Sequence, residues 1–215
     1  MSYFFYTLIP LEFLIQFILS NIPFPVFDIA LASLLSDFIS VFIPFLLLLL
    51  TGRKFLKAEW QKIQSKKRLI LSTFLTFLLI ALISYLCSLI IYAPVPEKEL
   101  TINKVSPLTI LLSTSSIMAA FIEEVSFRYL FLKNFSGYLW KSWLLLIVSS
   151  VLFGFLHIFV TQSLIATIPY MFLGLVLGIQ YIRNKSIWYP IATHIVNNFV
   201  ANVLPLIILY FRQLN

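Results

Sequence analysis

The residues best suited to chemistry in this sequence are ionisable side chains set inside long apolar runs. Placing such a group in a bilayer costs roughly 3 kcal/mol on insertion scales, and the group usually faces a bundle interior or a cavity. A side chain kept at that cost is therefore a candidate functional group. The candidates are Glu12, Asp37, Glu123, Glu124, Arg128, His157 and His194.

Segment 121–129 carries two adjacent glutamates followed by an arginine. Glu124 and Arg128 are four residues apart, so on a helix they share a face and can form an ion pair. Glu123 lies about 100° further round the helix and is not matched by the same arginine. A carboxylate left in this way can act as a general base or acid. In a purely structural interpretation, both glutamates bind Arg128.

The chain has two histidines, and both fall inside predicted membrane spans. His157 follows Phe153 by four positions, and Asn198 follows His194 by four, so each pair shares a helix face. A neutral imidazole and an amide can hold a water, bind a metal or donate to an oxyanion. An interhelical hydrogen bond is the structural alternative for each histidine.

The order of these three motifs resembles that of the CPBP family, which comprises CAAX prenyl endopeptidases and bacteriocin-processing proteins and is also called the Abi family. The matching segments are Glu123-Glu124-Val-Ser-Phe-Arg128, Phe153-Gly-Phe-Leu-His157 and His194-Ile-Val-Asn197-Asn198. The resemblance covers about residues 108–202. It implies an intramembrane endopeptidase that acts on a membrane protein or on a membrane-associated, leader or bacteriocin-like peptide.

The resemblance also implies a role for each motif residue. Glu123 and His157 are expected to activate the attacking water, while His194 and Asn198 are expected to stabilise the oxyanion. For these roles the side chains must meet in a water-filled cavity, which we expect in the cytoplasmic half of the membrane. Counting residues puts His157 deeper than the others, so its helix must tilt or begin early.

Three further residues and a metal complete the expected site. Glu124 and Arg128 are expected to orient the neighbouring carboxylate, and Phe153 to pack beside the first histidine. If the protein is a metalloprotease, Glu123, His157 and His194 would hold zinc, which accepts histidine nitrogen and carboxylate oxygen. Without metal, a base and convergent donors still make an acyl-transfer site.

Two other functions use the same residues. One is a catalytically silent relative, such as an immunity protein or a membrane chaperone that binds peptides. The other is an ion or metal transporter, which would need polar residues at successive depths along several helices. Here the polar residues cluster in three predicted spans, and this distribution favours the peptidase.

Composition indicates the architecture that must position these residues. Hydrophobic residues make up 61% of the chain and charged residues 11%, whereas soluble domains carry about 25% charged residues. The apolar residues come in long runs, which predict an all-α, polytopic transmembrane helical bundle of about seven spans. The predicted spans are 3–20, 29–51, 69–92, 108–132, 142–161, 164–182 and 187–211.

The distribution of positive charge predicts the orientation. Seven of the fifteen basic residues lie in loop 52–68, a pattern typical of a cytoplasmic membrane face and not of a nucleic-acid partner. With the N-terminus inside, the inner loops hold eleven basic residues, and the outer segments hold only Lys98, Lys104 and Arg212. We therefore expect an integral membrane protein with a cytoplasmic N-terminus. The short chain and its short loops favour a bacterial plasma membrane.

Three further features concern the domains, one loop and the helix packing. The motifs predict N-terminal transmembrane helices over 1–107 and a catalytic core over 108–215. Loop 52–68 has apolar residues at helical spacing, which indicates either an amphipathic helix on the headgroups or a solvated basic loop. Gly174 and Gly178 form a GxxxG pair that predicts close helix packing within the bundle.

Overall fold

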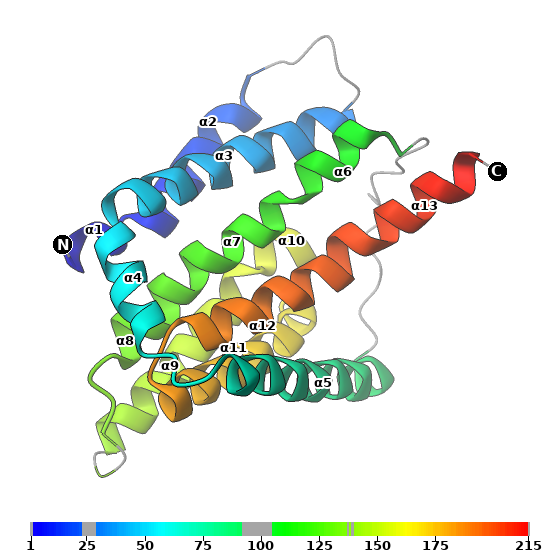
Figure 1. The fold of residues 1–215 in the computed structure, drawn as a ribbon. Coiled ribbons are helices and arrows are strands. Elements are labelled where there is room, and N and C mark those ends of the chain that lie inside the picture. The colour runs from blue at the N-terminus through cyan, green and yellow to red at the C-terminus, as the bar shows by residue number, and fades with distance from the viewer. Residues whose placement is uncertain (1, 23–28, 92–104, 137, 139, 215) are drawn as a thin grey trace. The chain divides into compact units, whose positions relative to one another are not determined.

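The protein is helical throughout the part of the chain that can be described. A computed structural model describes residues 2–22, 29–91, 105–136, 138 and 140–214. Every regular element in these ranges is a helix, and no strand occurs in them (Figure 1). The predicted all-α class is confirmed.

Six helical segments within the described ranges are long and apolar enough to cross a membrane. They are Ile29–Thr51, Lys66–Ile90, Pro107–Leu132, Trp140–Thr161, Ile165–Asn184 and Trp188–Leu214. These segments correspond to six of the seven predicted spans, so the chain is a polytopic integral membrane protein. Lys98 and Lys104, which entered the charge argument, lie outside the described residues.

The predicted first span, 3–20, is not a single helix. It consists of α1 (Ser2–Phe5) and α2 (Leu8–Ser20), and α2 has only 13 residues, fewer than the roughly 20 that a span needs. Pro10 explains the break, because its ring would clash with the carbonyl group of Tyr6 if the helix continued. The cytoplasmic placement of the N-terminus therefore stays a prediction.

Contacts within the chain form two compact units that alternate along the sequence. Unit one comprises Met1–Lys54, Lys98–Ile122 and Ile195–Asn215, and unit two comprises Phe55–Glu97 and Glu123–His194. The predicted division at residue 107 follows the motifs, whereas these units follow spatial contacts, so that division stays a prediction.

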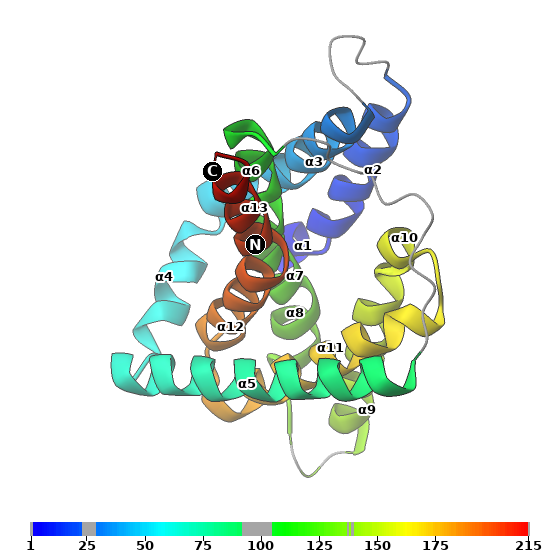
Figure 2. The ribbon, with the colours of Figure 1, turned by 90° about the vertical axis from the view of Figure 1, so that its right-hand side faces the viewer.

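Unit one is built on a pair of helices, α2 and α3 (Ile29–Thr51), which lie side by side (Figures 1 and 2). Gln16 on α2 donates a hydrogen bond from Nε2 to Oδ1 of Asp37 on α3, at 2.7 Å. This bond satisfies one of the ionisable groups within the membrane spans. Asp37 thus has a structural role between two helices.

In unit two, α9 (Trp140–Leu156) and α11 (Ile168–Asn184) form the most extensive helix pair among the described residues. A Cβ atom at Gly174 would lie 3.1 Å from the backbone of Ser150 on α9. A Cβ atom at Gly178 would lie 2.4 Å from Cδ1 of Leu146. The two glycines therefore permit close approach of the helices, which confirms the predicted packing role.

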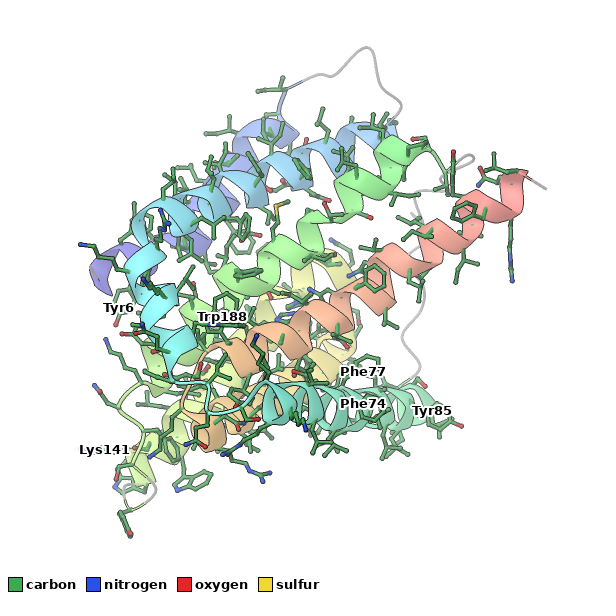
Figure 3. All side chains as sticks on the ribbon, in the orientation of Figure 1. Tyr6, Phe74, Phe77, Tyr85, Lys141 and Trp188 are labelled. Atoms are coloured by element: carbon green, nitrogen blue, oxygen red, sulfur yellow. The ribbon has the colours of Figure 1, made fainter. Side chains whose placement is uncertain are left out.

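Helix α5 (Lys66–Ile90) also belongs to unit two and packs across α11 (Figure 2). Most of its large apolar side chains are exposed, and Phe74 and Tyr85 are more than half exposed (Figure 3). In a membrane protein, such a surface faces lipid acyl chains rather than water.

The basic loop predicted over 52–68 contains a helix, α4 (Arg53–Gln61), so the helical alternative is confirmed over these residues. Within unit two, Nε1 of Trp188 donates to the carbonyl oxygen of Leu56 at 2.9 Å. The ring of Trp60 also lies edge-on to the ring of Trp188, with centroids 5.1 Å apart. Helix α4 thus contacts Trp188 through the backbone of Leu56 and the ring of Trp60.

The one acidic residue of α4 forms hydrogen bonds with residues at the start of α12 (Trp188–Asn198). Glu59 is buried, and its Oε2 accepts a hydrogen bond from the backbone N–H of Ile187 at 3.1 Å. The hydroxyl group of Ser186 donates to the carbonyl oxygen of Glu59 at 2.8 Å. Glu59 therefore satisfies a backbone donor at the beginning of the helix that carries His194.

Candidate active site

The two glutamates of the first motif end helix α7 (Ser115–Glu124), immediately before a π-helical turn, η1 (Val125–Tyr129). Such turns are rare and often occur at functional sites. The carbonyl oxygen of Phe127, inside this turn, accepts a hydrogen bond from the hydroxyl group of Ser149 on α9 at 2.7 Å. A side chain from a neighbouring helix thus satisfies the altered backbone.

Glu124 is the centre of a fully buried group of charges. Its Oε2 lies 3.1 Å from Nε of Arg128, the ion pair expected from their spacing. The N–H of Arg128 does not point along this line, so the contact is electrostatic rather than an aligned hydrogen bond. The guanidinium carbon lies 4.3 Å from the ring centroid of Phe153, which adds a cation–π contact.

The second oxygen of Glu124 binds the second histidine. Oε1 lies 2.8 Å from Nδ1 of His194, and both side chains are buried. A carboxylate can only accept, so Nδ1 carries the hydrogen and Nε2 of a neutral imidazole bears a lone pair. The buried carboxylate therefore fixes both the orientation and the tautomer of His194.

Glu123 faces the opposite side of the same imidazole. Its Oε2 lies 3.6 Å from Nε2 of His194, beyond direct hydrogen-bond distance. The side chain of Glu123 is 19% exposed, whereas that of Glu124 is completely buried. Two adjacent carboxylates thus flank one imidazole, and only Glu123 is accessible.

This geometry suits a water molecule. The lone pair on Nε2 of His194 and the carboxylate of Glu123 are both acceptors, so they repel each other without a donor between them. A water that rests against both atoms can donate one hydrogen to each. Its oxygen lone pairs then point away from both acceptors, as an attacking nucleophile requires.

His157 lies at the break between α9 and α10 (Ile158–Thr161). Its Nδ1 lies 2.9 Å from the carbonyl oxygen of Phe153, and its ring stacks on Tyr170 with centroids 4.1 Å apart. Tyr170 was not among the sequence candidates, because no pattern distinguishes it from the other nine tyrosines.

The ring of Phe153 connects the two histidines. Its centroid lies 4.9 Å from that of His157 and 5.8 Å from that of His194. The structure therefore brings both imidazoles onto one aromatic ring, and the expected contact of Phe153 with His157 is present. The predicted water-filled cavity around them stays a prediction.

Asn198 lies four residues after His194 on α12, as its spacing requires. Its Nδ2 donates to the carbonyl oxygen of Ser116 at 2.7 Å, and both residues belong to unit one. The other motif residues belong to unit two. The expected role of Asn198 in stabilising an oxyanion stays a prediction.

The predicted zinc ligands are Glu123, His157 and His194. Over the described ranges, no three His, Cys, Asp or Glu side chains are gathered so that they could hold a metal ion. Nδ1 of His194 is engaged by Glu124, and Nδ1 of His157 faces a backbone carbonyl group. Metal-ligating histidines commonly have one ring nitrogen bound in this way, so the zinc site stays a prediction.

Comparison with known proteins agrees with the motifs. Residues 105–200 match the family model described as type II CAAX prenyl endopeptidase, Rce1-like, and this interval contains every motif residue. No curated protein sequence matches the chain, and no solved structure matches it. Over residues 105–200 the chain is therefore similar to the Rce1-like family of CAAX proteases, which confirms the resemblance seen in its three motifs.

Proposed function

We propose that this protein is an intramembrane endopeptidase in which Glu123 is the general base. The observation that carries the proposal is the 3.6 Å separation between Oε2 of Glu123 and Nε2 of His194. Because buried Glu124 holds the other nitrogen of His194, this separation is set by packing. The family of the domain supports peptide-bond hydrolysis as the reaction.

The proposed reaction begins with a water molecule held between Glu123 and His194. The water oxygen attacks the peptide carbonyl carbon, a C–O bond forms, and Glu123 takes the proton. The C–N bond then breaks as Glu123 returns the proton to the leaving amine. The products are a carboxylate and an amine, so Glu123 is regenerated without a co-reactant.

The remaining motif residues support this step. Glu124 keeps the lone pair of His194 directed at the water, and Arg128 balances the buried negative charge. Phe153 packs on both imidazoles and restricts water around them. His157, which also contacts Phe153, is the proposed polar group that meets the substrate, and Asn198 keeps the oxyanion role expected from its motif. In the proposal His194 acts beside Glu123, rather than only at the oxyanion.

The proposed substrate is a membrane-associated peptide. The chain has six segments that can cross a bilayer, and its reactive groups lie within them, so water-soluble peptides would have to enter the membrane to react. The cluster of basic residues on 53–68 supports a cytoplasmic N-terminus, and a bacterial plasma membrane is the proposed location. A prenylated CAAX peptide and a leader peptide are the two substrate types to compare.

The test uses the full-length protein in liposomes made with ¹⁸O-labelled water. The probes are a farnesylated CAAX peptide, the same peptide without the farnesyl group, and an amphipathic leader peptide. We expect a product with ¹⁸O in its new carboxylate from the wild type, none from Glu123→Gln, and no effect of a chelator. Asp37→Asn is the matched control, because it also neutralises an intramembrane carboxylate, and it should retain activity.

Equal product from wild type and Glu123→Gln would remove Glu123 from the mechanism. Chelator sensitivity would establish a metal-dependent enzyme instead. Saturable binding of a probe peptide without cleavage, under every condition tested, would favour a silent peptide-binding protein.

A further inference from the structure

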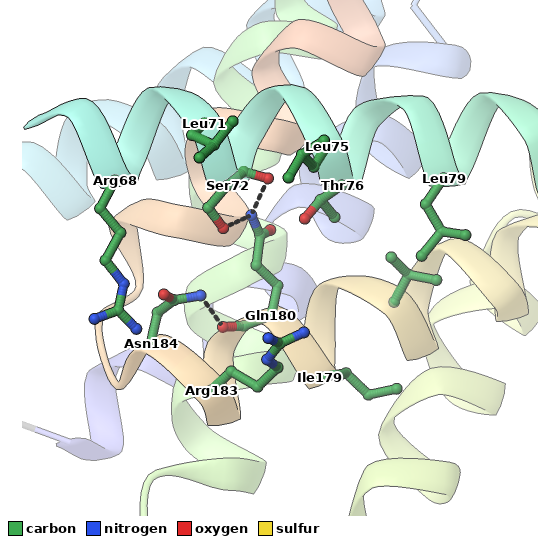
Figure 4. Close-up of a pocket in the computed structure, with 11 residues that line it drawn as sticks. Arg68, Leu71, Ser72, Leu75, Thr76, Leu79, Ile179, Gln180, Arg183 and Asn184 are labelled. Carbon is green, nitrogen blue, oxygen red and sulfur yellow. Dashed lines mark hydrogen bonds between the residues drawn. The ribbon is translucent and has the colours of Figure 1, made fainter.

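A groove runs between α5 and α11, and no motif residue lines it. Leucines of α5 line one wall, and Val176 and Ile179 of α11 line the other (Figure 4). The enclosed volume is about 300 Å³. Leu71 and Leu75 are more than half exposed, so in a bilayer this groove opens toward lipid.

One end of the groove is polar and positively charged. Arg68, near the beginning of α5, and Arg183, near the end of α11, both line it, together with Asn184 (Figure 4). Because α5 begins and α11 ends at this place, the two guanidinium groups lie at the same end of two antiparallel spans. That end is the predicted cytoplasmic face, where basic residues meet anionic headgroups.

A second cavity continues this charged end. It shares Arg68, Arg183 and Asn184 with the groove and encloses about 910 Å³. Its lining adds three further cations, which are Lys62, Lys133 and Lys185. No acidic residue is among the described side chains that line either cavity. The two cavities therefore form an apolar slot that ends in a cluster of cations.

A buried polar side chain lies at the base of the groove. Gln180 is 4% exposed, and its Nε2 donates to the hydroxyl oxygens of Ser72 at 3.1 Å and Thr193 at 2.9 Å. Its Oε1 is buried and has no hydrogen-bond partner within the described chain. Gln180 of α11 thus connects this helix to α5 and to α12. These hydrogen bonds fix the base of the groove.

We propose that this groove is a binding site for one anionic phospholipid. An acyl chain would lie along the leucines of α5, and the phosphate group would bind Arg68 and Arg183. A phosphate accepts charge-assisted hydrogen bonds from guanidinium groups, and the order of apolar slot and charged end matches the order of a phospholipid in the membrane. The site does not depend on peptidase activity.

The test is native mass spectrometry of the full-length protein after detergent removal of co-purified lipid. Phosphatidylglycerol and phosphatidylcholine are titrated separately, and inorganic phosphate is a third ligand. We expect one retained phosphatidylglycerol per protein, with at least about tenfold weaker retention in Arg68→Gln/Arg183→Gln. Phosphatidylcholine and inorganic phosphate should bind more weakly than phosphatidylglycerol to the wild type.

The matched control is Lys66→Gln/Lys67→Gln. It removes the same charge from the same end of α5, and neither lysine lines the described cavities. Val176→Trp should also displace the lipid, because it fills the apolar slot without changing charge. Unfolding temperatures without lipid establish that the variants are folded.

Equal weakening by both double variants would show a diffuse charge effect and overturn the proposal. Equal retention of phosphatidylcholine would also overturn it. Inorganic phosphate that competes at the concentration of the lipid would show an anion site rather than a lipid site.

Discussion

Nδ1 of His194 lies 2.8 Å from Oε1 of Glu124, although the two residues are 70 positions apart in the chain. This contact separates the roles of the two adjacent glutamates. Glu124 is fully buried and holds an imidazole and an arginine, whereas Glu123 is partly exposed and faces the other imidazole nitrogen. One carboxylate builds the site, and its neighbour is accessible to water.

Glu124→Gln should destabilise the protein far more than Glu123→Gln. The first substitution leaves buried Arg128 without its charge partner, and breaking a buried pair in this way costs about 3–5 kcal/mol. The second changes a partly exposed group that binds no arginine. Thermal unfolding of both variants in detergent checks the order. Similar unfolding temperatures would mean that Arg128 finds another anion.

Gly154→Ala should destabilise the helix pair that carries the first histidine. A Cβ atom there would lie 2.6 Å from the backbone nitrogen of Met171, so one helix must shift. The expected loss is about 1–3 kcal/mol, as for overpacked cores, and activity should fall because Phe153 lies on α9 and His157 follows its last residue. Unfolding temperature and cleavage rate measure the two effects.

Gly178→Ala is the matched control for this prediction. Its Cβ atom would meet Cδ1 of Leu146, the end of a flexible side chain, and no backbone atom within the same range. It should therefore be the milder of the two substitutions. A larger effect of Gly178→Ala would show that side-chain packing limits the approach of α9 and α11.

Glu59→Ala should weaken the site indirectly, through the start of α12. The substitution leaves the buried N–H of Ile187 without its carboxylate acceptor, and hydrogen bonds to charged groups contribute about 1.5–3 kcal/mol. Lys62→Ala is the control, because it removes the half-exposed partner of Glu59 and leaves the bond from Ile187 to the carboxylate in place. Equal unfolding temperatures of the two variants would remove Glu59 from this role.

Lys57 and Lys141 should both lie on the cytoplasmic side. Each is exposed, and each precedes or begins a span. In a Cys87→Ser background, a cysteine at either position should react with a membrane-impermeant maleimide only after the cells are opened. Labelling of intact cells at Lys57→Cys would reverse the proposed orientation.

Much of the fold follows from the sequence, because apolar runs of spanning length leave the backbone little choice but helix. The exception is the segment before residue 21. Its apolar composition resembles that of a span, but Pro10 interrupts the helix. Hydropathy is averaged over a window of residues, so it does not show that Pro10 lacks the backbone N–H group that a helix needs.

The candidate site could be predicted only in part. Spacing shows that Glu124 can reach Arg128, because both lie on one helix. No spacing rule shows that its other oxygen reaches His194, since that contact depends on how distant helices pack. For the same reason the link from Glu59 to α12 was missed, although a lone acidic residue in a basic loop was a signal.

The central claim is that Glu123 and His194 hold the same water, and a double-mutant cycle on cleavage tests it most directly. The measurement compares the kcat/KM value of the wild type with the values of Glu123→Gln, His194→Ala and the double variant. Because either substitution removes the shared water, we predict that the double variant is hardly slower than the slower single variant. Losses that multiply in the double variant would show that the two side chains act independently, and would contradict this account.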